Sequence, residues 1–346
     1  MIDLISIVLD IEHKKFGSER KKRTEDGEVK TKQFTKTIHI NHVPVFVTSM
    51  NDGTRIYIRC CPLKVFQGHN VFGTNRLKLL WVRLIVDVMK ELNITPSKLQ
   101  LQEWLRGEFA IEEIHITHRF SVKEYSMVRK VVHHVRRYAR ESLFPSPIRK
   151  GTGITLRGEH HHASALIYDK CREFGDKRTK EQKYLEAVVG DKAEDAKRLL
   201  SQLASKSIRF ELKLKKEYLR DNQLDRGKFW TSRKSVEVFS RELELMRLNE
   251  IPAMATLPEV YAGIDNPKLR SVVILWANGE DMTEHYASST IRKYRKSVLE
   301  VLGIDILNDQ PVLETACIKM SEVFDIGNML TGFPKWARKY PELALR

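Results

Sequence analysis

Three short segments of the sequence carry polar side chains that alternate with apolar ones. In the segment 163–170 (ASALIYDK), Tyr168 and Lys170 fall on the same face of a strand, because strand side chains alternate between faces. A phenol has a pKa of about 10 and is a weak nucleophile at neutral pH. A neighbouring ammonium group and a metal-polarised phosphate would ease its attack on that phosphate. Tyr168 and Lys170 are therefore candidate catalytic residues, and the alternative is a core tyrosine with a solvent-facing lysine.

The other two segments could supply ligands for a divalent metal ion. Glu113 and His115 point the same way from the segment 110–120. A carboxylate and an imidazole two residues apart on one strand face can share a metal ion. Glu211, on the polar face of the third segment, could complete the site, and Arg209 beside it could hold a phosphate bidentately. The alternative for both segments is an ordinary solvated polar face.

The bulk composition favours a nucleic-acid partner. The 346 residues include 60 Lys and Arg against 45 Asp and Glu, a formal net charge of +15, which is typical of nucleic-acid binders, although a basic protein without such a partner is the alternative. No apolar run reaches the roughly 18 residues of a membrane span, and the first residues lack the pattern of a signal peptide. We therefore expect no membrane partner. The four cysteines form no CxxC pair, so we expect free thiols in a reducing cytoplasm.

The elements that must position these residues alternate between strands and long helices, which predicts an α+β or α/β fold. Strands are expected near residues 2–11, 35–48, 55–66, 110–120, 153–170 and 207–214. Helices are expected near residues 75–92, 122–142 and 178–204. After about residue 225 the pattern becomes mainly helical. We therefore predict a first domain over 1–225 and a helical C-terminal domain over 226–346.

The segment 61–74 (CPLKVFQGHNVFGT) resembles a signature of the filamentous-phage replication initiators, the gene II protein or Phage CRI family. Four further segments resemble family motifs in the same order. They are the start at residues 1–4, the strand 114–121 (IHITHRFS), the tyrosine motif at 165–170 and the Arg-Phe-Glu strand at 208–219 (IRFELKLKKEYL). Together the matches span residues 1 to about 225.

This resemblance implies a central, mostly antiparallel sheet with flanking helices, similar to HUH-type endonucleases and plasmid rolling-circle initiators. It implies an endonuclease that nicks one strand of a circular duplex and becomes joined through a tyrosine to the 5′ phosphate. The free 3′-OH would prime synthesis, and the enzyme would later rejoin the displaced strand. By position, Tyr168 takes the role of the nucleophile and Glu211 that of a metal ligand. The matching Tyr218 is the alternative nucleophile.

One departure from the family pattern concerns the metal ligands. The family's acidic residue on the 114–121 strand aligns with Thr117, and its arginine aligns with His115. We therefore expect His115 and Glu113 to bind the ion with Glu211, an arrangement similar to the two histidines of HUH enzymes. The expected ion is Mg²⁺ or Mn²⁺. No GxxxxGKS or GxxxxGKT segment is present for ATP, and the phosphotyrosine bond would itself store the energy for rejoining.

The C-terminal region also resembles family relatives. The segment 271–281 predicts a helix ended by Gly279, and the segment 288–296 predicts a second, basic helix. A helix, a turn and a basic helix fit a helix-turn-helix-like reader of the origin, and a plain helical hairpin is the alternative. The residues that we expect to contact DNA are Arg292, Arg295 and Lys296 here, with Gln67, His69, Asn70 and Arg209 in the first domain.

The sequence thus predicts a rolling-circle replication initiator of a phage, acting in the host cytoplasm. Its expected partners are the double-stranded circular origin, the displaced single strand, and a host helicase and polymerase. Two other functions remain open. A non-catalytic DNA-binding regulator would show salt-sensitive binding without a metal requirement. A tyrosine transposase or recombinase would use similar chemistry on two DNA partners.

Overall fold

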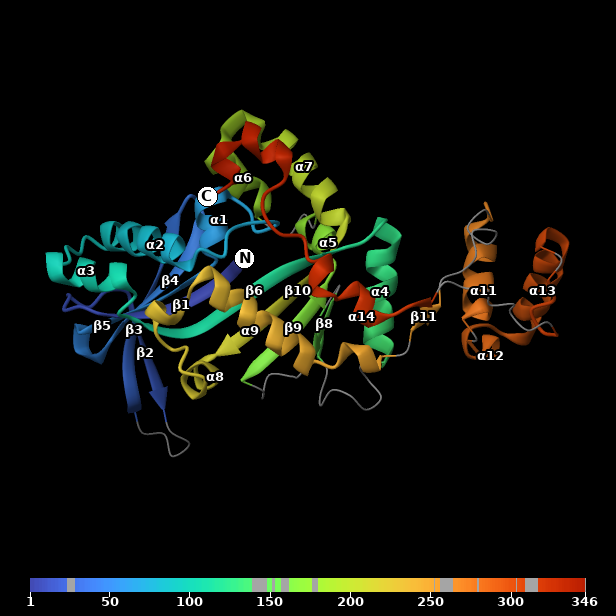
Figure 1. Cartoon of the computed structure of the whole chain (residues 1–346), viewed down its shortest axis with the longest axis horizontal. Helices are drawn as coiled ribbons and strands as arrows, with labels where there is room; N and C mark the ends of the chain where they lie inside the picture. The colour runs from blue at the N-terminus through green and yellow to red at the C-terminus, as the bar shows by residue number, and fades with distance from the viewer. Residues whose placement is uncertain are drawn as a thin grey trace. The chain divides into compact units, whose positions relative to one another are not determined.

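The chain forms two compact units in a computed structural model (Figure 1). The residues that the structure describes are 1–23, 29–138, 148–150, 153–156, 162–175, 180–251, 253–255, 264–278, 280–302, 304–308 and 317–345. Unit 1 comprises Met1–Leu248 together with Phe324–Arg346, and unit 2 comprises Asn249–Val323. These bounds differ from the expected division near residue 225, because residues 226–248 and the C-terminal segment pack with unit 1.

Unit 1 is built on one large sheet, which has ten strands among the described residues, in the order β2-β3-β4-β5-β1-β6-β10-β9-β8-β7. All of the strand pairs in this described sheet are antiparallel, which confirms the expected α+β class with a mostly antiparallel sheet. The strands are β1 (Ile2–Asp10), β2 (Ser18–Arg23), β3 (Val29–Ile40), β4 (Val43–Met50), β5 (Arg55–Cys60), β6 (Ala110–Ser121), β7 (Ile148–Lys150), β8 (Gly153–Leu156), β9 (Ala163–Tyr168) and β10 (Ser207–Lys215).

The chain's hydrophobic pattern explains which strands are central. In β1 nearly every residue is buried, as expected for a strand covered on both faces. In β4 buried residues alternate with more exposed ones, which fits a strand nearer the edge. The expected strand 35–48 is a hairpin, because Asn41 and His42 adopt positive φ angles of 49° and 63° and reverse the chain. A two-residue hairpin turn with both central φ angles positive matches the twist of the flanking strands.

The helices of unit 1 connect and cover these strands. They are α1 (Pro62–Gln67), α2 (Leu77–Glu91), α3 (Lys98–Arg106), α4 (Tyr125–Tyr138), α5 (Lys170–Phe174), α6 (Glu181–Val189), α7 (Ala193–Ser205), α8 (Lys216–Asp221) and α9 (Ser232–Leu245). The long helix expected at 178–204 is two helices, because Gly190 takes φ 56° and ψ −130° at the end of α6. None of the described helices is long and apolar enough to span a membrane.

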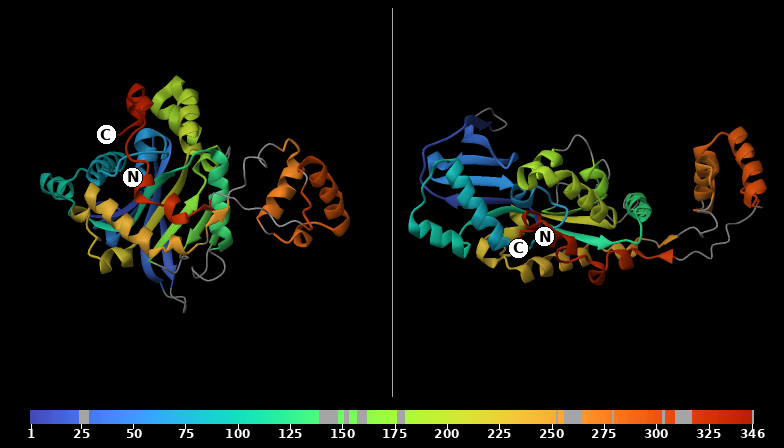
Figure 2. Two further views of the ribbon diagram at one scale, coloured as in Figure 1. Left: turned by 45° about the vertical axis from the view of Figure 1, so that its right-hand side comes forward. Right: turned by 90° about the horizontal axis from the view of Figure 1, so that it is seen from above.

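Helices cover the two faces of the central strands differently. On one face Phe239 of α9 contacts the rings of Phe210 and His118, with centroids 5.5 and 4.3 Å apart. On the opposite side of the sheet lie α6 and α7, as Figure 2 shows. Their apolar cluster includes Phe174 of α5 and Leu200 of α7. The odd-numbered residues of β10 point to this second face, toward α5.

Unit 2 is mainly helical, as expected for the C-terminal region. It contains β11 (Met254–Ala255), α11 (Pro267–Ala277), α12 (Met282–His285), α13 (Ser288–Leu302), β12 (Cys317–Ile318) and α14 (Met320–Val323). The side chain of Asn266 caps α11 by accepting hydrogen bonds from two backbone amides of its first turn. Val272, Trp276 and Val298 lie in its apolar core, so α11 and α13 pack together. Gly279, the expected end of the first helix, lies outside the described residues.

Candidate active site

Three strands bring the polar residues of the candidate site onto one face of the sheet. Tyr168, the last residue of β9, pairs directly with Arg209 of β10, and Arg209 pairs with Arg119 of β6. Directly paired residues in an antiparallel sheet point to the same face. Glu211, two residues beyond Arg209, returns to this face opposite Thr117. The polar faces that alternation predicted on the three strands therefore meet.

A chain of hydrogen bonds leads from the phenol to two carboxylates. The Tyr168 hydroxyl donates a long hydrogen bond of 3.4 Å to Oε2 of Glu211. Oε1 of Glu211 lies 2.8 Å from Nδ1 of His115, and Nε2 of His115 lies 2.7 Å from Oε1 of Glu113. The first three residues are each less than a tenth exposed. The structure thus places the predicted phenol, imidazole and carboxylates in contact.

Burial and hydrogen bonding set the charges along this chain. Burial raises the pKa of Tyr168 well above its ordinary value, so the phenol is neutral at physiological pH. Burial also opposes charge on His115 and Glu211. The hydrogen bonds of His115 to Glu113 and Glu211, together with the opposite charges of these groups, outweigh burial. The pKa of His115 is therefore raised and the pKa of Glu211 is lowered. An ionised Glu211 can accept the proton of the phenol.

Arg209 supplies positive charge next to the phenol. Its guanidinium carbon lies 5.8 Å from the centroid of the Tyr168 ring. The side chain is fully buried and donates from Nη2 to Oδ2 of Asp3 over 2.7 Å, and from Nη1 to the carbonyl of Asn70. We expected Arg209 to contact DNA directly. It lies instead in the interior, where Asp3 balances its charge and holds it beside Tyr168.

Asp3 is the member of this cluster that the sequence analysis did not identify. It lies inside the mostly apolar strand β1, and a carboxylate inside a buried strand was the available signal. Burial raises its pKa, but the charge of Arg209 more than offsets this, so the pKa is lowered. Asp3 also accepts hydrogen bonds from the Asn70 amide at 2.7 Å and the Cys61 thiol at 3.1 Å.

Lys170 occupies a different position from the one expected. It begins α5, is 1 % exposed, and pairs through its ammonium group with Glu173 one helical turn away. Burial lowers its pKa. Within the described part of the chain Lys170 makes no hydrogen bond to Tyr168. Its predicted role as the activating cation is therefore better filled by Arg209.

The same cluster has the residue types of a metal site but a different arrangement. Both ring nitrogens of His115 are engaged by carboxylates, so the imidazole has no free lone pair for an ion in this arrangement. Among the described residues no group of three or more His, Cys, Asp or Glu side chains has the arrangement of a metal site. Glu113, His115 and Glu211 therefore do not fit a divalent ion as they stand, and their role as ligands remains a prediction.

Gln67, His69 and Asn70 are interior residues, which corrects the expectation that they contact DNA. Gln67 and His69 are 0 % exposed and Asn70 is 5 % exposed. The Gln67 amide donates to the carbonyl of Phe72 over 2.6 Å, and the His69 Nε2 donates to the carbonyl of Leu343 over 3.0 Å. These contacts fix the loop after α1 against the C-terminal segment, so the chemically unusual motif is structural here.

The alternative nucleophile, Tyr218, lies on α8 in separate surroundings. Its hydroxyl donates to Oε1 of Glu242 over 2.7 Å and accepts from Arg241. Burial and the Glu242 hydrogen bond raise its pKa to about 12. Neither contact belongs to the hydrogen-bond chain that contains Tyr168 and Glu211.

The basic residues expected to read DNA in unit 2 lie on α13. Arg292 and Lys296 are exposed, and Lys296 lies 4.0 Å from Glu300. Arg295 is half-buried and forms a two-point ion pair with Asp305, with contacts of 2.7 and 2.5 Å. Arg292 and Lys296 are thus available to a phosphate backbone, whereas Arg295 anchors the loop that follows its helix.

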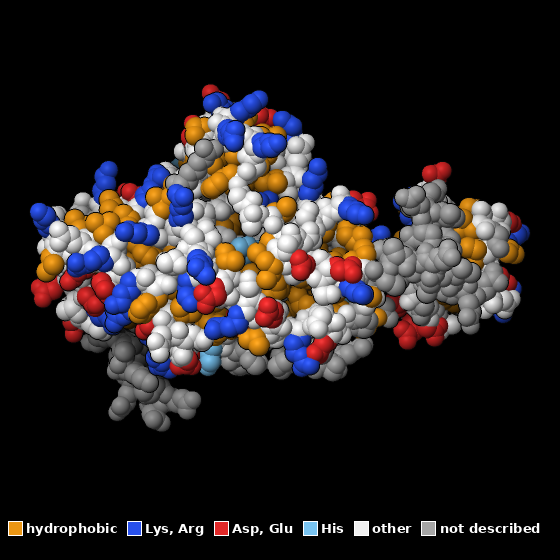
Figure 3. All heavy atoms as spheres, viewed as in Figure 1, with side chains coloured by type: hydrophobic (Ala, Val, Ile, Leu, Met, Phe, Trp, Pro, Cys, Tyr) orange, Lys and Arg blue, Asp and Glu red, His pale blue; other side chains and the backbone are white. Residues whose placement is uncertain are grey.

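Charged side chains are dispersed over the face of the molecule drawn in Figure 3. Figure 3 shows Lys and Arg side chains over many parts of one face, interspersed with carboxylates. Exposed basic residues include Lys183 on α6, Arg198 on α7 and Lys192 in the turn between these helices. The buried position of the Tyr168 cluster means that its polar groups are supported by the fold and are separate from this surface charge.

Comparison with known proteins identifies the class to which this fold and site belong. Residues 1–233 match the model of a family described as the N-terminal part of the phage replication-associated protein, the gene II protein, and the chain belongs to this family. A relative is the replication-associated gene II protein of Enterobacteria phage I2-2. It is 27 % identical over 260 residues, which cover 73 % of this chain and 70 % of the relative. The resemblance to phage replication initiators that the motifs indicated is thereby confirmed.

Proposed function

We propose that this phage replication protein initiates rolling-circle replication by nicking one strand of a circular duplex, with Tyr168 as the nucleophile. The observation that carries the proposal is the buried contact between the Tyr168 hydroxyl and the Glu211 carboxylate, which His115 holds in place. A neutral phenol requires a base before it can attack phosphorus, and an ionised carboxylate within hydrogen-bond reach can act as that base.

In the proposed step Glu211 takes the phenolic proton as the tyrosine oxygen bonds to phosphorus. The bond between phosphorus and the 3′ oxygen breaks, and that oxygen leaves with a proton from solvent. The products are a 5′-phosphotyrosine and a free 3′-OH that can prime synthesis. Arg209 stabilises the negative charge that develops beside the ring. His115, held by Glu113, keeps Glu211 oriented throughout.

The reverse reaction rejoins a strand without a nucleotide cofactor. A 3′-OH attacks the phosphotyrosine and releases its proton to solvent, the bond between phosphorus and the tyrosine oxygen breaks, and the proton on Glu211 returns to the leaving phenolate. The same residues serve in both directions, because the two half-reactions pass through the same transition state. Circular duplex DNA and the displaced single strand are thus the proposed substrates, and the exposed Arg292 and Lys296 of unit 2 are proposed backbone contacts.

The test is to incubate the protein with a supercoiled plasmid that carries the origin region of its phage, in the presence of Mg²⁺ or Mn²⁺. We expect nicked circles bound covalently to protein, and mass spectrometry of the DNA-linked peptide should identify Tyr168. Tyr168→Phe should abolish the adduct, whereas Tyr218→Phe should retain it. An adduct on Tyr218 would overturn the assignment of the nucleophile, and salt-sensitive binding without any nicking would favour a DNA-binding regulator.

A further inference from the structure

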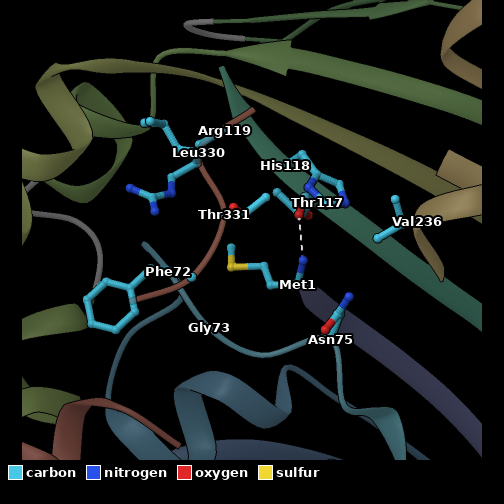
Figure 4. A pocket seen from close by; sticks show the side chains of 11 residues that line it. Met1, Phe72, Gly73, Asn75, Thr117, His118, Arg119, Val236, Leu330 and Thr331 are labelled. Carbon is cyan, nitrogen blue, oxygen red and sulfur yellow. Dashed lines mark hydrogen bonds between the residues drawn. The ribbon is translucent and has the colours of Figure 1, made fainter. Parts of the chain in front are cut away.

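A cavity of about 120 Å³ lies where two segments of unit 1 meet the same edge of β6 (Figure 4). Met1, which directly precedes β1, pairs with Thr117, whose amide donates to the Met1 carbonyl over 2.8 Å. The C-terminal segment pairs further along, where the Leu330 amide donates to the carbonyl of Arg119 over 2.7 Å. Between these two contacts the edge of β6 is open, and Thr117, His118 and Arg119 line the space.

Three polar atoms of this short stretch of β6 have no hydrogen-bond partner among the residues that the structure describes. They are Oγ1 of Thr117, Nε2 of His118 and Nη1 of Arg119. The three side chains are 0 %, 7 % and 6 % exposed, respectively. Buried polar groups in folded proteins nearly always have a partner. Thr117 and Arg119 point to the sheet face that carries Tyr168, whereas His118 points to the opposite face and packs against Phe239. The two exceptions on the Tyr168 face therefore indicate a ligand. The cavity is several times the roughly 10–15 Å³ that a single water requires.

The charge of Arg119 distinguishes an anion from water as that ligand. No carboxylate pairs with Arg119 among the described residues, and the charged group that acts on it is Arg209, its direct neighbour on β10. Burial and Arg209 lower the pKa of Arg119 to about 10, so it is still charged at neutral pH. Water can satisfy a hydrogen bond, but only an anion balances a buried guanidinium.

We propose that this cavity binds a phosphate group of the DNA strand, one that flanks the phosphate attacked by Tyr168. Arg119 and Tyr168 are both paired with Arg209 on the strand between them. Their Cα atoms are therefore about two strand spacings apart, roughly 10 Å, which is close enough for two phosphates of one strand to occupy both sites. The Thr117 hydroxyl, on the same face as Arg119, would add a hydrogen bond to a phosphate oxygen. The choice of DNA rests on the proposed function, whereas the preference for phosphate rests on the cavity alone.

The first experiment uses inorganic phosphate and does not depend on nicking. Thermal unfolding of the full chain is measured in a phosphate-free buffer of constant ionic strength, with increasing phosphate balanced by chloride. A ligand that binds the folded state raises the unfolding temperature. We expect phosphate to raise it for the wild type and for Arg220→Met, which removes an exposed arginine. We expect no rise for Arg119→Met and a smaller rise for Thr117→Val. Equal shifts in all four proteins would overturn the phosphate site.

The second experiment asks whether the phosphate comes from DNA. Single-stranded oligonucleotides that span the mapped nick carry one uncharged methylphosphonate linkage, moved by one position from one oligonucleotide to the next. They are bound to the full-length Tyr168→Phe variant with and without Arg119→Met. We expect a methylphosphonate at one flanking position to weaken binding to the Tyr168→Phe variant about tenfold. The same oligonucleotide should bind the double variant with Arg119→Met as well as the unmodified strand does.

Losses that are the same in both proteins at every position would overturn DNA as the source. If inorganic phosphate still protects the wild type through Arg119 in that case, the ligand is free phosphate. If no covalent adduct forms in the nicking assay, the oligonucleotide series is run at every linkage of an origin strand. Failure of the proposed catalytic function is thus distinguishable from failure of the phosphate site.

Discussion

The Tyr168 hydroxyl reaches Oε2 of Glu211 diagonally across two neighbouring strands. Tyr168 pairs directly with Arg209, and Glu211 pairs with Leu166, so the phenol extends along β10 to meet a carboxylate two residues away. Diagonal neighbours in an antiparallel sheet are within reach of aromatic and long side chains. Because Arg209 pairs directly with Tyr168, its guanidinium lies beside the ring. Because Glu211 is the diagonal neighbour, its carboxylate contacts the hydroxyl. One phenol is therefore in contact with a cation and a base at the same time.

Substitution of Glu211 by glutamine should separate chemistry from binding. The amide keeps the shape of the side chain but cannot accept a proton, so we expect the nicking rate to fall by about 10²–10⁴. The affinity for origin DNA should change less than about threefold. Single-turnover nicking and a filter-binding titration measure the two quantities. Glu217→Gln, at a half-exposed position on α8, is the matched control, and an equal rate for both variants would exclude Glu211 as the base.

His115 should behave as a positioning residue. We expect His115→Gln to slow single-turnover nicking by about 10–10² and to leave the DNA affinity unchanged, because both ring nitrogens of His115 contact carboxylates of the protein. Glu113→Gln should have a smaller effect, since Glu113 is partly exposed and also pairs with Arg59. The double variant Glu211→Gln with His115→Gln should be no slower than Glu211→Gln alone. Additive losses in this cycle would show that His115 acts independently of Glu211.

Asp3→Asn should destabilise unit 1 strongly, because it leaves Arg209 buried without a counter-charge. Breaking a buried ion pair by removing one partner costs about 3–5 kcal/mol of unfolding free energy. Replacing both partners, as in Asp3→Asn with Arg209→Met, should recover much of that loss. Urea unfolding at neutral pH measures the three variants. If Asp3→Asn is as stable as the wild type, the ion pair between Asp3 and Arg209 does not stabilise the fold.

The burial of His69 predicts that the free energy of unfolding falls in mild acid. Its Nδ1 accepts from the Val71 amide at 3.2 Å and its Nε2 donates to Leu343, so the ring is held neutral. Burial lowers its pKa to about 3, whereas the unfolded value is about 6.5. The unfolded chain therefore binds a proton that the folded chain does not between those values. Stability should fall as the pH drops from about 6.5 toward 3, by up to about 1.4 kcal/mol per pH unit.

The variant His69→Gln should be less stable at neutral pH but should show a flatter dependence of unfolding free energy on pH. Urea unfolding between pH 6.5 and 4.5 measures the slope. His39→Gln, at an exposed position on β3, is the control and should keep the wild-type slope. A slope that is the same with and without His69 would contradict the assignment of a neutral ring in the folded state.

Metal dependence is the remaining prediction from the family pattern. If Mg²⁺ or Mn²⁺ binds at Glu113, His115 and Glu211, it must displace a hydrogen bond of His115. The family pattern thus predicts that nicking stops in EDTA and returns on addition of either ion. Paramagnetic broadening of the His115 ring resonances by Mn²⁺ would locate the ion. Undiminished nicking in EDTA would establish that the imidazole and carboxylates act without a metal.

The sequence predicted the site by strand alternation, which depends only on local geometry. Glu113, His115 and Glu211 lie on the faces that a period of two requires, and the long strands β6 and β10 kept that period over many residues. Asp3 was missed because its importance comes from a contact with Arg209, more than 200 positions away in the chain. Single-sequence patterns contain no information about such distant pairings.

The motif around Gln67 shows a second limit of prediction from sequence, in which structural polar residues are mistaken for binding residues. Its polar side chains suggested contacts with DNA, and they instead satisfy the backbone of a tight loop and of residues 343–345. Gly68, at φ +72°, explains part of the pattern, because a Cβ there would lie 2.7 Å from the Tyr184 carbonyl. A polar motif can thus be required for packing, and sequence alone does not separate that requirement from binding.

Unit 2 is inserted into unit 1 between Leu248 and Phe324, and its entering and leaving strands, β11 and β12, pair side by side. The chain therefore passes into and out of this helical unit at neighbouring points. Such a connection makes the helical part exchangeable, because a short hairpin turn between β11 and β12 would leave the sheet that carries Tyr168 unbroken.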